Sequence, residues 1–185
     1  MNSKGFTLIE LIIVISIIGI LAIALGISFQ GWIGRYKIES EFKEMYVDLM
    51  NAKTRAMSRN RTHFVSLTTT QYTIYEDTNT APDGNGTLET ASDTQVLQKN
   101  LDANHPITWS NVANIQIEFN TRGILCERDA MSNLCINDDK VICSNTDIES
   151  DYDCIVISAS RVNLGKLTTR IPDGGTCDDA NCVAR

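Results

Sequence analysis

The sequence predicts an α+β fold, in which one long N-terminal helix packs on an antiparallel β-sheet or β-sandwich. An almost uncharged apolar stretch opens the chain, an amphipathic stretch with helical spacing follows it, and short β-rich runs separated by turn residues make up the rest. A length of 185 residues suits one globular domain. With 43% hydrophobic and 21% charged residues, the chain is neither disordered nor low in complexity.

The first element is the apolar stretch 6–29, in which the only charged residue is Glu10. As a helix, a segment of this length spans about 36 Å, which is enough to cross a bilayer. A cleaved secretory signal has a shorter apolar core of about 7–15 residues with the small residue after it, whereas here Gly5 precedes the apolar residues. Because a carboxylate inside an apolar helix costs about 2.5–3.5 kcal/mol on insertion scales, we expect Glu10 to be functional or paired.

The segment Gly5-Phe6-Thr7-Leu8-Ile9-Glu10-Leu11 resembles the processing and assembly signature of type IV pilins and type II secretion pseudopilins. The resemblance implies that a membrane-embedded prepilin peptidase cuts after Gly5, that Phe6 becomes the N-methylated terminus, and that Glu10 helps subunits join a filament. The new amine at Phe6 of a neighbouring subunit is a cation that can neutralise Glu10. The alternative is a plain membrane anchor, which has no use for Glu10 or for a glycine directly before Phe6.

The second element is the amphipathic stretch 30–61. One apolar stripe recurs at steps of four and three residues and consists of Ile38, Phe42, Met45, Leu49, Ala52 and Ala56. This spacing predicts that the helix packs on the chain's own sheet, because a coiled-coil seam would need more heptads. Gly26, Gly31 and Gly34 lie between the two halves of the helix and predict a bend or local melting there.

The helix end and the strand after it narrow the resemblance. Residues 49–61, followed by Phe64-Val65-Ser66-Leu67, resemble the GspH/FimT family of minor pilins and pseudopilins, in which a similar small and basic pattern runs directly into the first strand. The cations in the last turns, Lys53, Arg55, Arg59 and Arg61, are explained by the negative end of the helix dipole. Residues 117–123 and 155–162 resemble that family's two recurring C-terminal strand segments.

The globular part, residues 62–185, is predicted to be β structure. Seven short β-rich runs, separated by turn residues, are expected to be strands: 63–67, 71–75, 96–101, 114–119, 141–143, 154–158 and 167–171. Tyr72 with Ile74, and Ile115 with Ile117 and Phe119, alternate with polar neighbours as half-buried strands do. Together with a leader at residues 1–5, these segments give four parts: 1–5, 6–29, 30–61 and 62–185.

Two acidic loops contain alternating oxygen-bearing side chains, as some cation sites do. Asp83, Asn85, Thr87 and Glu89 alternate like oxygen ligands for calcium, but they do not complete an EF-hand loop. Asp147, Glu149, Asp151 and Asp153 also alternate, which is typical of one exposed side of a loop. We therefore interpret both as solvated acidic loops, and we expect no metal or cofactor.

All six cysteines lie after residue 125, with no C-x-x-C spacing: Cys126, Cys135, Cys143, Cys154, Cys177 and Cys182. The spacing argues against zinc and thioredoxin-like chemistry, and an even number in an exported domain predicts disulfides. Fifteen pairings are possible. Local geometry favours Cys143 with Cys154 across the base of a hairpin and Cys177 with Cys182 in a small loop, which leaves Cys126 with Cys135.

No catalytic motif accompanies the two histidines. His63 opens a predicted strand and His105 precedes a proline, so both are expected at the surface or a sheet edge, and we expect no enzyme activity. Binding to nucleic acid, known for some members of the family, is the main alternative. It is disfavoured by the formal net charge of −7, although Arg161, Lys166 and Arg170 are candidates for a small basic patch on adjacent strands.

These observations predict a minor pilin or pseudopilin with a structural role. The resemblance implies a single-pass protein of the bacterial inner membrane, with its globular domain in the periplasm, that later joins a type IV pilus or type II secretion filament. Its expected partners are other pilins or pseudopilins, prepilin peptidase, the inner-membrane assembly platform and membrane lipid. A membrane-anchored β domain outside any filament is the remaining alternative.

Overall fold

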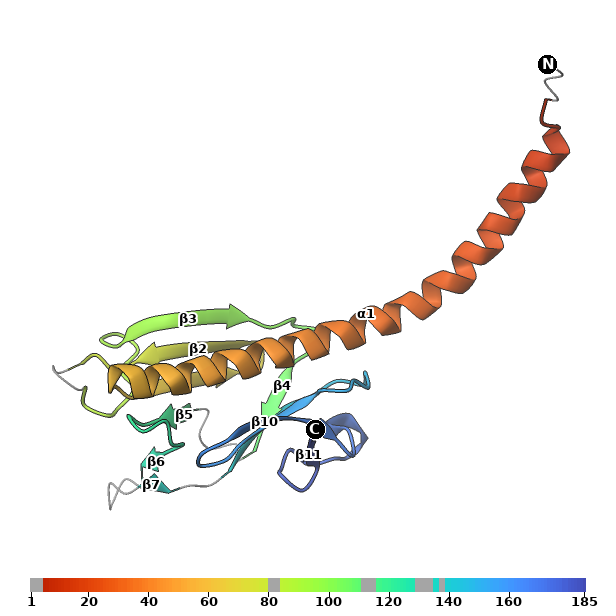
Figure 1. Cartoon of the computed structure of the whole chain (residues 1–185). Helices are drawn as coiled ribbons and strands as arrows, with labels where there is room; N and C mark the ends of the chain where they lie inside the picture. The colour runs from red at the N-terminus through yellow and green to blue at the C-terminus, as the bar shows by residue number, and fades with distance from the viewer. Residues whose placement is uncertain (1–4, 80–83, 111–115, 129–134, 137–138) are drawn as a thin grey trace.

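The computed structural model describes residues 5–79, 84–110, 116–128, 135–136 and 139–185, without the side chains of residues 24–30, 127–128 and 135–136. One helix, α1 (Leu8–Arg59), is followed by a β domain that packs on only its C-terminal half (Figure 1). The predicted α+β class, with an N-terminal helix packed on antiparallel sheets, is confirmed. The calcium-like run begins at Asp83, which lies outside the described residues.

The strands form two main antiparallel sheets and a small hairpin. The first sheet has the order β3-β2-β1-β5, from β1 (His63–Thr68), β2 (Gln71–Glu76), β3 (Thr94–Asn100) and β5 (Gln116–Phe119). The second has the order β11-β10-β9-β8-β4, from β4 (Ile107–Trp109), β8 (Lys140–Ser144), β9 (Cys154–Ile157), β10 (Val162–Leu167) and β11 (Cys182–Ala184). The hairpin pairs β6 (Glu127–Arg128) with β7 (Cys135–Ile136).

The helix packs on both sheets through the predicted stripe. Its six residues from Ile38 to Ala56 are each at most 2% exposed, and they join one core with residues of both sheets, such as Val65 and Ile155. The helix contacts β1, β5, β9 and β10. The prediction that this face packs on the chain's own sheet is therefore confirmed.

The helix is continuous through the glycines that predicted a bend or local melting. It curves between its exposed half and its packed half (Figure 1). Local melting is therefore wrong, because each glycine costs a helix only about 1 kcal/mol, which the hydrogen-bonded turns on either side outweigh. Gly34 has a packing role instead: a Cβ atom there would lie 2.6 Å from Ile148 Cδ1. The helix ends at Arg59, where Asn60 takes a left-handed conformation and donates its N–H to Ala56 O.

Most strand predictions agree with the structure, one is wrong, and residues 114–115 of the expected run 114–119 lie outside the described residues. The run 167–171 was expected to be a strand, but the strand is β10 (Val162–Leu167), and Ile171 begins a short 3-10 helix, η1 (Ile171–Asp173). Pro172 lies within η1 and has no backbone N–H to donate to a sheet. In β10, Gly165 has no side chain and interrupts the alternation of apolar and polar residues that identifies a strand.

Candidate functional site

The N-terminal signature lies at the far end of the exposed half of the helix. Phe6 is 84% exposed and Gly5 has no neighbouring atom within 4 Å of a Cβ placed on it. Thr7 caps the helix: its backbone is extended and its Oγ1 accepts a hydrogen bond from Glu10 N at 3.4 Å. The Gly5–Phe6 bond therefore precedes the first helical turn and is open to an enzyme.

Glu10 occupies the third position of that first helical turn, after the Thr7 cap. Thr7 and Glu10 together match the T-x-x-E capping box, a local signal that our reading of the sequence missed. A carboxylate in the first turn is also favoured by the positive end of the helix dipole. The sequence thus fixes where Glu10 sits relative to the exposed Phe6, one helical turn away.

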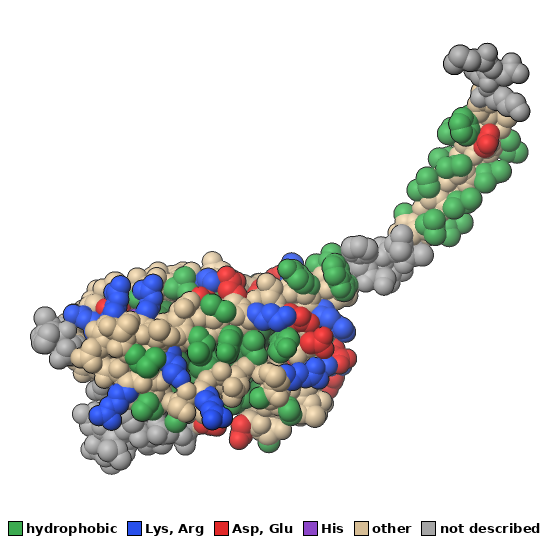
Figure 2. All heavy atoms as spheres, viewed as in Figure 1, with side chains coloured by type: hydrophobic (Ala, Val, Ile, Leu, Met, Phe, Trp, Pro, Cys, Tyr) green, Lys and Arg blue, Asp and Glu red, His purple; other side chains and the backbone are tan. Residues whose placement is uncertain are grey.

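The apolar side chains of the exposed half point in all directions around the helix. From Leu8 to Ile23 they are between 46% and 76% exposed, and Figure 2 shows them without cover from the domain. A helix that is apolar all round is stable only where another apolar phase covers it. The predicted spanning stretch, 6–29, includes side chains outside the described residues. Within the described part of the chain, no helix is both long and apolar enough to cross a membrane.

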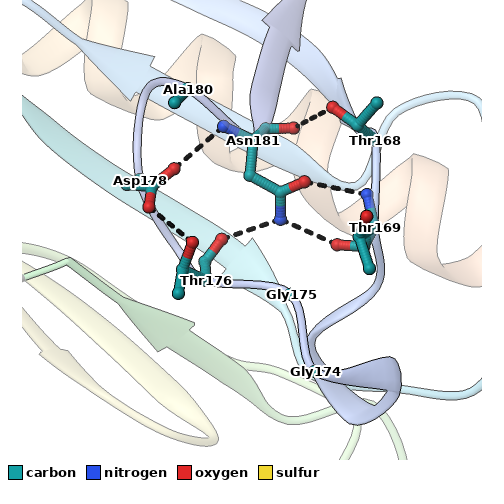
Figure 3. Close-up of a pocket in the computed structure, with 8 residues that line it drawn as sticks. All are labelled: Thr168, Thr169, Gly174, Gly175, Thr176, Asp178, Ala180 and Asn181. Atoms are coloured by element: carbon teal, nitrogen blue, oxygen red, sulfur yellow. Dashed lines mark hydrogen bonds between the residues drawn. The ribbon is translucent and has the colours of Figure 1, made fainter.

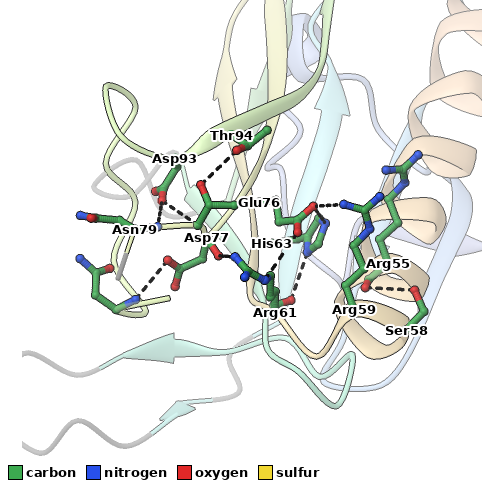
Figure 4. Close-up of polar contacts among 12 residues, drawn as sticks. Arg55, Ser58, Arg59, Arg61, His63, Glu76, Asp77, Asn79, Asp93 and Thr94 are labelled. Carbon is green, nitrogen blue, oxygen red and sulfur yellow. Dashed lines mark hydrogen bonds and ion pairs between the residues drawn. The ribbon is translucent and has the colours of Figure 1, made fainter. Parts of the chain in front are cut away.

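At the opposite end of the helix, charged residues hold it to the first sheet. Glu76 is only 5% exposed, and its Oε2 lies 2.7 Å from Arg59 Nη1 and 3.9 Å from His63 Nε2 (Figure 4). Arg61 Nε lies 3.8 Å from the other carboxylate oxygen. The arginines that the helix dipole alone seemed to explain therefore also neutralise a buried carboxylate.

Both histidines are buried, so the prediction of surface or sheet-edge histidines is wrong. His63 is 0% exposed and His105 is 8% exposed. His63 is the first residue of β1, but the end of α1 covers it, and its Nδ1 lies 3.1 Å from Arg61 O. Burial lowers the pKa of His63 below its usual 6.5, and this effect is partly opposed by the hydrogen bond that the ring donates to Arg61 O and by the negative charge of Glu76.

The acidic residues of the loop after β2 organise that loop. Asp77 is fully buried and accepts hydrogen bonds from the backbone N–H groups of Asn85 and Gly86, at 3.1 and 2.6 Å. Asp93 accepts from the N–H groups of Thr78 and Glu89. These carboxylates cap backbone groups, and among the described residues no group of three or more His, Cys, Asp or Glu side chains is placed to hold a metal ion.

The second acidic loop is only partly exposed. Asp147, Glu149 and Asp151 face solvent, as predicted, but Asp153 is 2% exposed and accepts a hydrogen bond from Leu167 N at 2.7 Å. Burial raises the pKa of Asp153. The prediction that all four share one exposed side is therefore wrong at Asp153, which caps the end of β10 instead.

The candidate basic patch for nucleic acid is not assembled. Lys166 Nζ lies 2.7 Å from Glu149 Oε1, and Arg170 Nη2 lies 2.7 Å from Asp173 Oδ2. Lys166 also lowers the pKa of Glu149. Because two of the three cations are matched by carboxylates, Arg161 remains as the exposed member, and the three do not present a common basic surface.

The disulfides connect different cysteines from those expected. The bonds are Cys143–Cys177 and Cys154–Cys182, so the expected pairs Cys143–Cys154 and Cys177–Cys182 are wrong. Cys143 and Cys154 are indeed opposite each other in β8 and β9. The expected pair Cys126–Cys135 involves Cys135, whose side chain lies outside the described residues.

The reason for this pairing is that the second sheet is covered on both faces. Ile142, Ile155 and Ile157 belong to the core under the helix, whereas Val141, Cys143, Cys154 and Val156 form a second cluster with Leu167 and Cys182. Cys143 and Cys154 thus face the C-terminal segment rather than each other. Gly165 leaves space for one bridge, since a Cβ there would lie 2.7 Å from Cys182 Sγ and 3.1 Å from Cys154 Sγ.

The C-terminal segment lines an open, shallow pocket of about 460 Å³ (Figure 3). Asn181 organises it: its Nδ2 donates to Thr169 O and Thr176 O, both at 2.7 Å, and its Oδ1 accepts from Thr169 N at 2.8 Å. Asp178 accepts a hydrogen bond from Asn181 N at 2.8 Å. These polar groups bond to one another, so their evident role is to fold the segment that carries Cys177 and Cys182.

Comparison with known proteins supports the N-terminal assignment. Residues 1–26 match the prokaryotic N-terminal methylation motif. No curated protein matches the chain.

Two solved structures are similar in fold. The type IV minor pilin FimU of Pseudomonas aeruginosa has 17% identity and a TM-score of 0.48, over 72% of this chain and 91% of that one. The minor pseudopilin EpsH from the Type 2 Secretion System of Vibrio cholerae has 11% identity and a TM-score of 0.45, over 70% of this chain and 97% of that one. Neither TM-score reaches 0.5, so these two likenesses carry no assignment, and the family-level similarity of the chain is the prokaryotic N-terminal methylation motif at residues 1–26, which contains Gly5, Phe6 and Glu10.

Proposed function

We propose that the protein is a structural subunit of a type IV pilus or type II secretion filament, a minor pilin or pseudopilin of the GspH/FimT type. One observation carries the proposal: half of a 52-residue helix is apolar all round and free of its own domain, and it begins with the methylation motif. Such a helix is stable in lipid before assembly and among other helices after it. The globular half provides the surface that each subunit contributes to the filament.

In this proposal, the N-terminus is processed before assembly. Prepilin peptidase cuts the exposed Gly5–Phe6 bond, and the new amine of Phe6 is methylated. Residues 6–29 hold the subunit in the inner membrane, with the β domain in the periplasm, until the inner-membrane assembly platform adds it to a filament. Lipid and the helices of other pilins or pseudopilins are its successive partners.

Glu10 then gives the filament its register. In an apolar bundle an unpaired carboxylate is costly, so a subunit is most stable where the amine of a neighbouring Phe6 meets Glu10. The Thr7 cap keeps Glu10 at a fixed place in the first turn. A subunit one helical turn out of position would leave both charges unpaired.

Intact-mass measurement of the protein from membranes tests the processing step. We expect the loss of Met1 to Gly5 and the gain of one methyl group. The variant Gly5→Ala should retain the leader, whereas Gly19→Ala should be processed normally because its Cβ would meet no atom within 4 Å. An unprocessed wild-type N-terminus in cells with an active prepilin peptidase would contradict the proposal.

The assembly step is tested with Glu10→Ala. The domain should fold as before, because Glu10 is exposed and lies in the first turn of α1, in the half of the helix on which the domain does not pack (Figure 1). We expect a processed, membrane-inserted subunit that is largely missing from filaments, with Ser16→Ala as the control on the same exposed half. Normal piliation or secretion with Glu10→Ala would show that the carboxylate is not needed for assembly.

A further inference from the structure

The two described disulfides are interleaved along the chain. Cys143–Cys177 spans 34 residues, and Cys154–Cys182 begins inside this span and ends beyond it. Among these four cysteines, the nearest in the sequence are instead Cys143 with Cys154, 11 residues apart, and Cys177 with Cys182, 5 residues apart. We call these two bonds the neighbour pairing and the observed bonds the native pairing. Because the frequency of loop closure falls roughly as the 3/2 power of loop length, an unfolded chain forms Cys143–Cys154 about fivefold more readily than Cys143–Cys177.

The second sheet also accommodates the neighbour pairing. Cys143 in β8 and Cys154 in β9 are direct partners across the two strands. Opposite residues of antiparallel strands have Cα atoms about 4.5–5.5 Å apart and side chains on the same face, and a disulfide needs a Cα separation of about 4.4–6.8 Å. A bond between Cys143 and Cys154 therefore fits the β8–β9 hairpin after rotation of the two side chains, without movement of the backbone.

The C-terminal segment supplies the observed partners of both cysteines. Cys182 is opposite Leu167 where β11 pairs with β10, and Asn181 holds the turn before it by hydrogen bonds (Figure 3). These contacts place the segment over the face that carries Cys143 and Cys154. The segment follows both cysteines in the chain, so it is synthesised and exported after them. Cys143 and Cys154 therefore meet each other before either observed partner arrives.

We propose that a second protein, a thiol–disulfide isomerase in the compartment of the domain, converts the neighbour pairing into the native pairing. The inference rests on the proposed function only in that the domain is exported to the oxidising periplasm. The isomerase supplies a reactive thiolate and no net electrons, because both pairings contain two disulfides. In the neighbour pairing no bond ties the C-terminal segment to the sheet, so Cys177–Cys182 is the bond that this thiolate reaches.

Three exchanges complete the conversion, and each breaks one S–S bond as it forms another. The thiolate of the isomerase attacks Cys177 Sγ, which gives a mixed disulfide and releases the thiolate of Cys182. That thiolate attacks Cys154 Sγ and releases the thiolate of Cys143. The thiolate of Cys143 then attacks Cys177 Sγ and releases the thiolate of the isomerase. The sulfur atoms are neither oxidised nor reduced overall, and the isomerase is regenerated.

Docking of the C-terminal segment then protects the native pairing. Cys143, Cys154 and Cys182 are buried in the folded domain, and Cys177 is half-buried. Exchange requires a thiolate to approach a sulfur atom, so burial slows any return to the neighbour pairing. The isomerase therefore acts before the segment docks, and the folded domain no longer needs it.

Oxidation of the reduced, full-length chain tests this pathway. Diamide, an oxidant that adds no thiol, oxidises the chain completely in guanidinium. The denaturant is then replaced by detergent, with or without reduced glutathione, whose thiolate stands for that of the isomerase. Digestion at Asp and Glu separates the four cysteines, because acidic residues lie between each of them and the next, and mass spectrometry without reduction counts each pair.

Before the denaturant is removed, we expect about five times more Cys143–Cys154 than Cys143–Cys177. In detergent, we expect the native pairing to replace the neighbour pairing only where glutathione is present. Native pairing that forms without glutathione would overturn the inference, because the chain would then need no external thiolate.

Cells with and without a periplasmic thiol–disulfide isomerase test the partner itself. Without the isomerase, the native pairing of the wild type should fall about fivefold or more. The matched control, Cys154→Ser with Cys182→Ser, can form neither bond of the neighbour pairing, so its Cys143–Cys177 bond should form equally in both strains. Equal native pairing of the wild type in both strains would overturn the inference and leave the filament proposal intact. A domain without disulfides in either strain would contradict the periplasmic location, and the inference would fall with it.

Discussion

The disulfide connectivity makes a quantitative prediction about the stability of the domain. The bond Cys154–Cys182 closes a loop of 28 residues, and Cys143–Cys177 closes one of 34. In the chain-entropy description of a crosslink, loops of these lengths stabilise the folded state by about 3.6 and about 3.8 kcal/mol. Replacing both cysteines of one bond should therefore lower the free energy of unfolding by about half as much as replacing one cysteine of each bond, because the second change breaks both bonds.

Two double variants separate the observed pairing from the one that the sequence alone favoured. Cys154→Ser with Cys182→Ser removes one complete bond, so we expect a loss of about 3.6 kcal/mol and no additional free thiol. Cys143→Ser with Cys154→Ser breaks both bonds, so we expect a loss of about 7 kcal/mol and two additional free thiols. Under the alternative pairing, the second variant would be the mild one.

The measurement uses the full-length chain in detergent. Guanidinium unfolding is followed by the fluorescence of Trp109 in a Trp32→Phe background, and free thiols are counted by alkylation and intact mass without reduction. Equal stability losses in the two variants would refute the loop-entropy reasoning. Additional thiols in Cys154→Ser with Cys182→Ser would refute the pairing itself.

Three further predictions concern the core, the glycine of β10 beside the disulfide, and the histidine. Leu49→Ala should lower the free energy of unfolding by about 3–4 kcal/mol, because Leu49 is 0% exposed. Val47→Ala on the same helix should change it by less than about 0.5 kcal/mol, because Val47 is exposed. Denaturant unfolding of the two variants measures both changes. Gly165→Ala should cost about 1–3 kcal/mol in the same assay, since the added Cβ would lie 2.8 Å from Val183 O and 2.7 Å from Cys182 Sγ, and unchanged stability would contradict the close approach. Because folding lowers the pKa of His63, the unfolded state binds more protons, so the free energy of unfolding should fall as the pH drops below about 6.5. His63→Gln should make this decrease less steep, and identical slopes in the two proteins would rule out His63 as its source.

Local signals in the sequence predicted much of the fold. The stripe from Ile38 to Ala56 identifies the buried face of the helix, because its spacing depends only on helix geometry and not on the surface that covers this face. The strands at His63, Gln71 and Cys154 were predicted for the same reason, since their apolar residues and flanking turns lie close together in the chain. The N-terminal signature is also local, with Gly5, Phe6 and Glu10 inside one short segment.

Several predictions that depended on contacts between distant segments failed, in addition to the local ones at residues 167–171 and at the helix glycines. His63 and Asp153 are polar, and nothing near them in the sequence shows that α1 and β10 cover them. Lys166 was expected in a basic patch, but its charge is paired with Glu149, which lies 17 residues away in the sequence. The charges and polar groups of these residues are paired with groups that come close to them only in the folded domain.

The sequence by itself determined the division of the helix into an apolar half and a half-buried one, and it determined where the signature residues lie. Only the tertiary structure decided the disulfides, because Cys143 and Cys154 are opposite each other on a face that the C-terminal segment covers. A periodic pattern reports which face of an element is apolar, but the neighbour that meets that face depends on how distant segments fold back together.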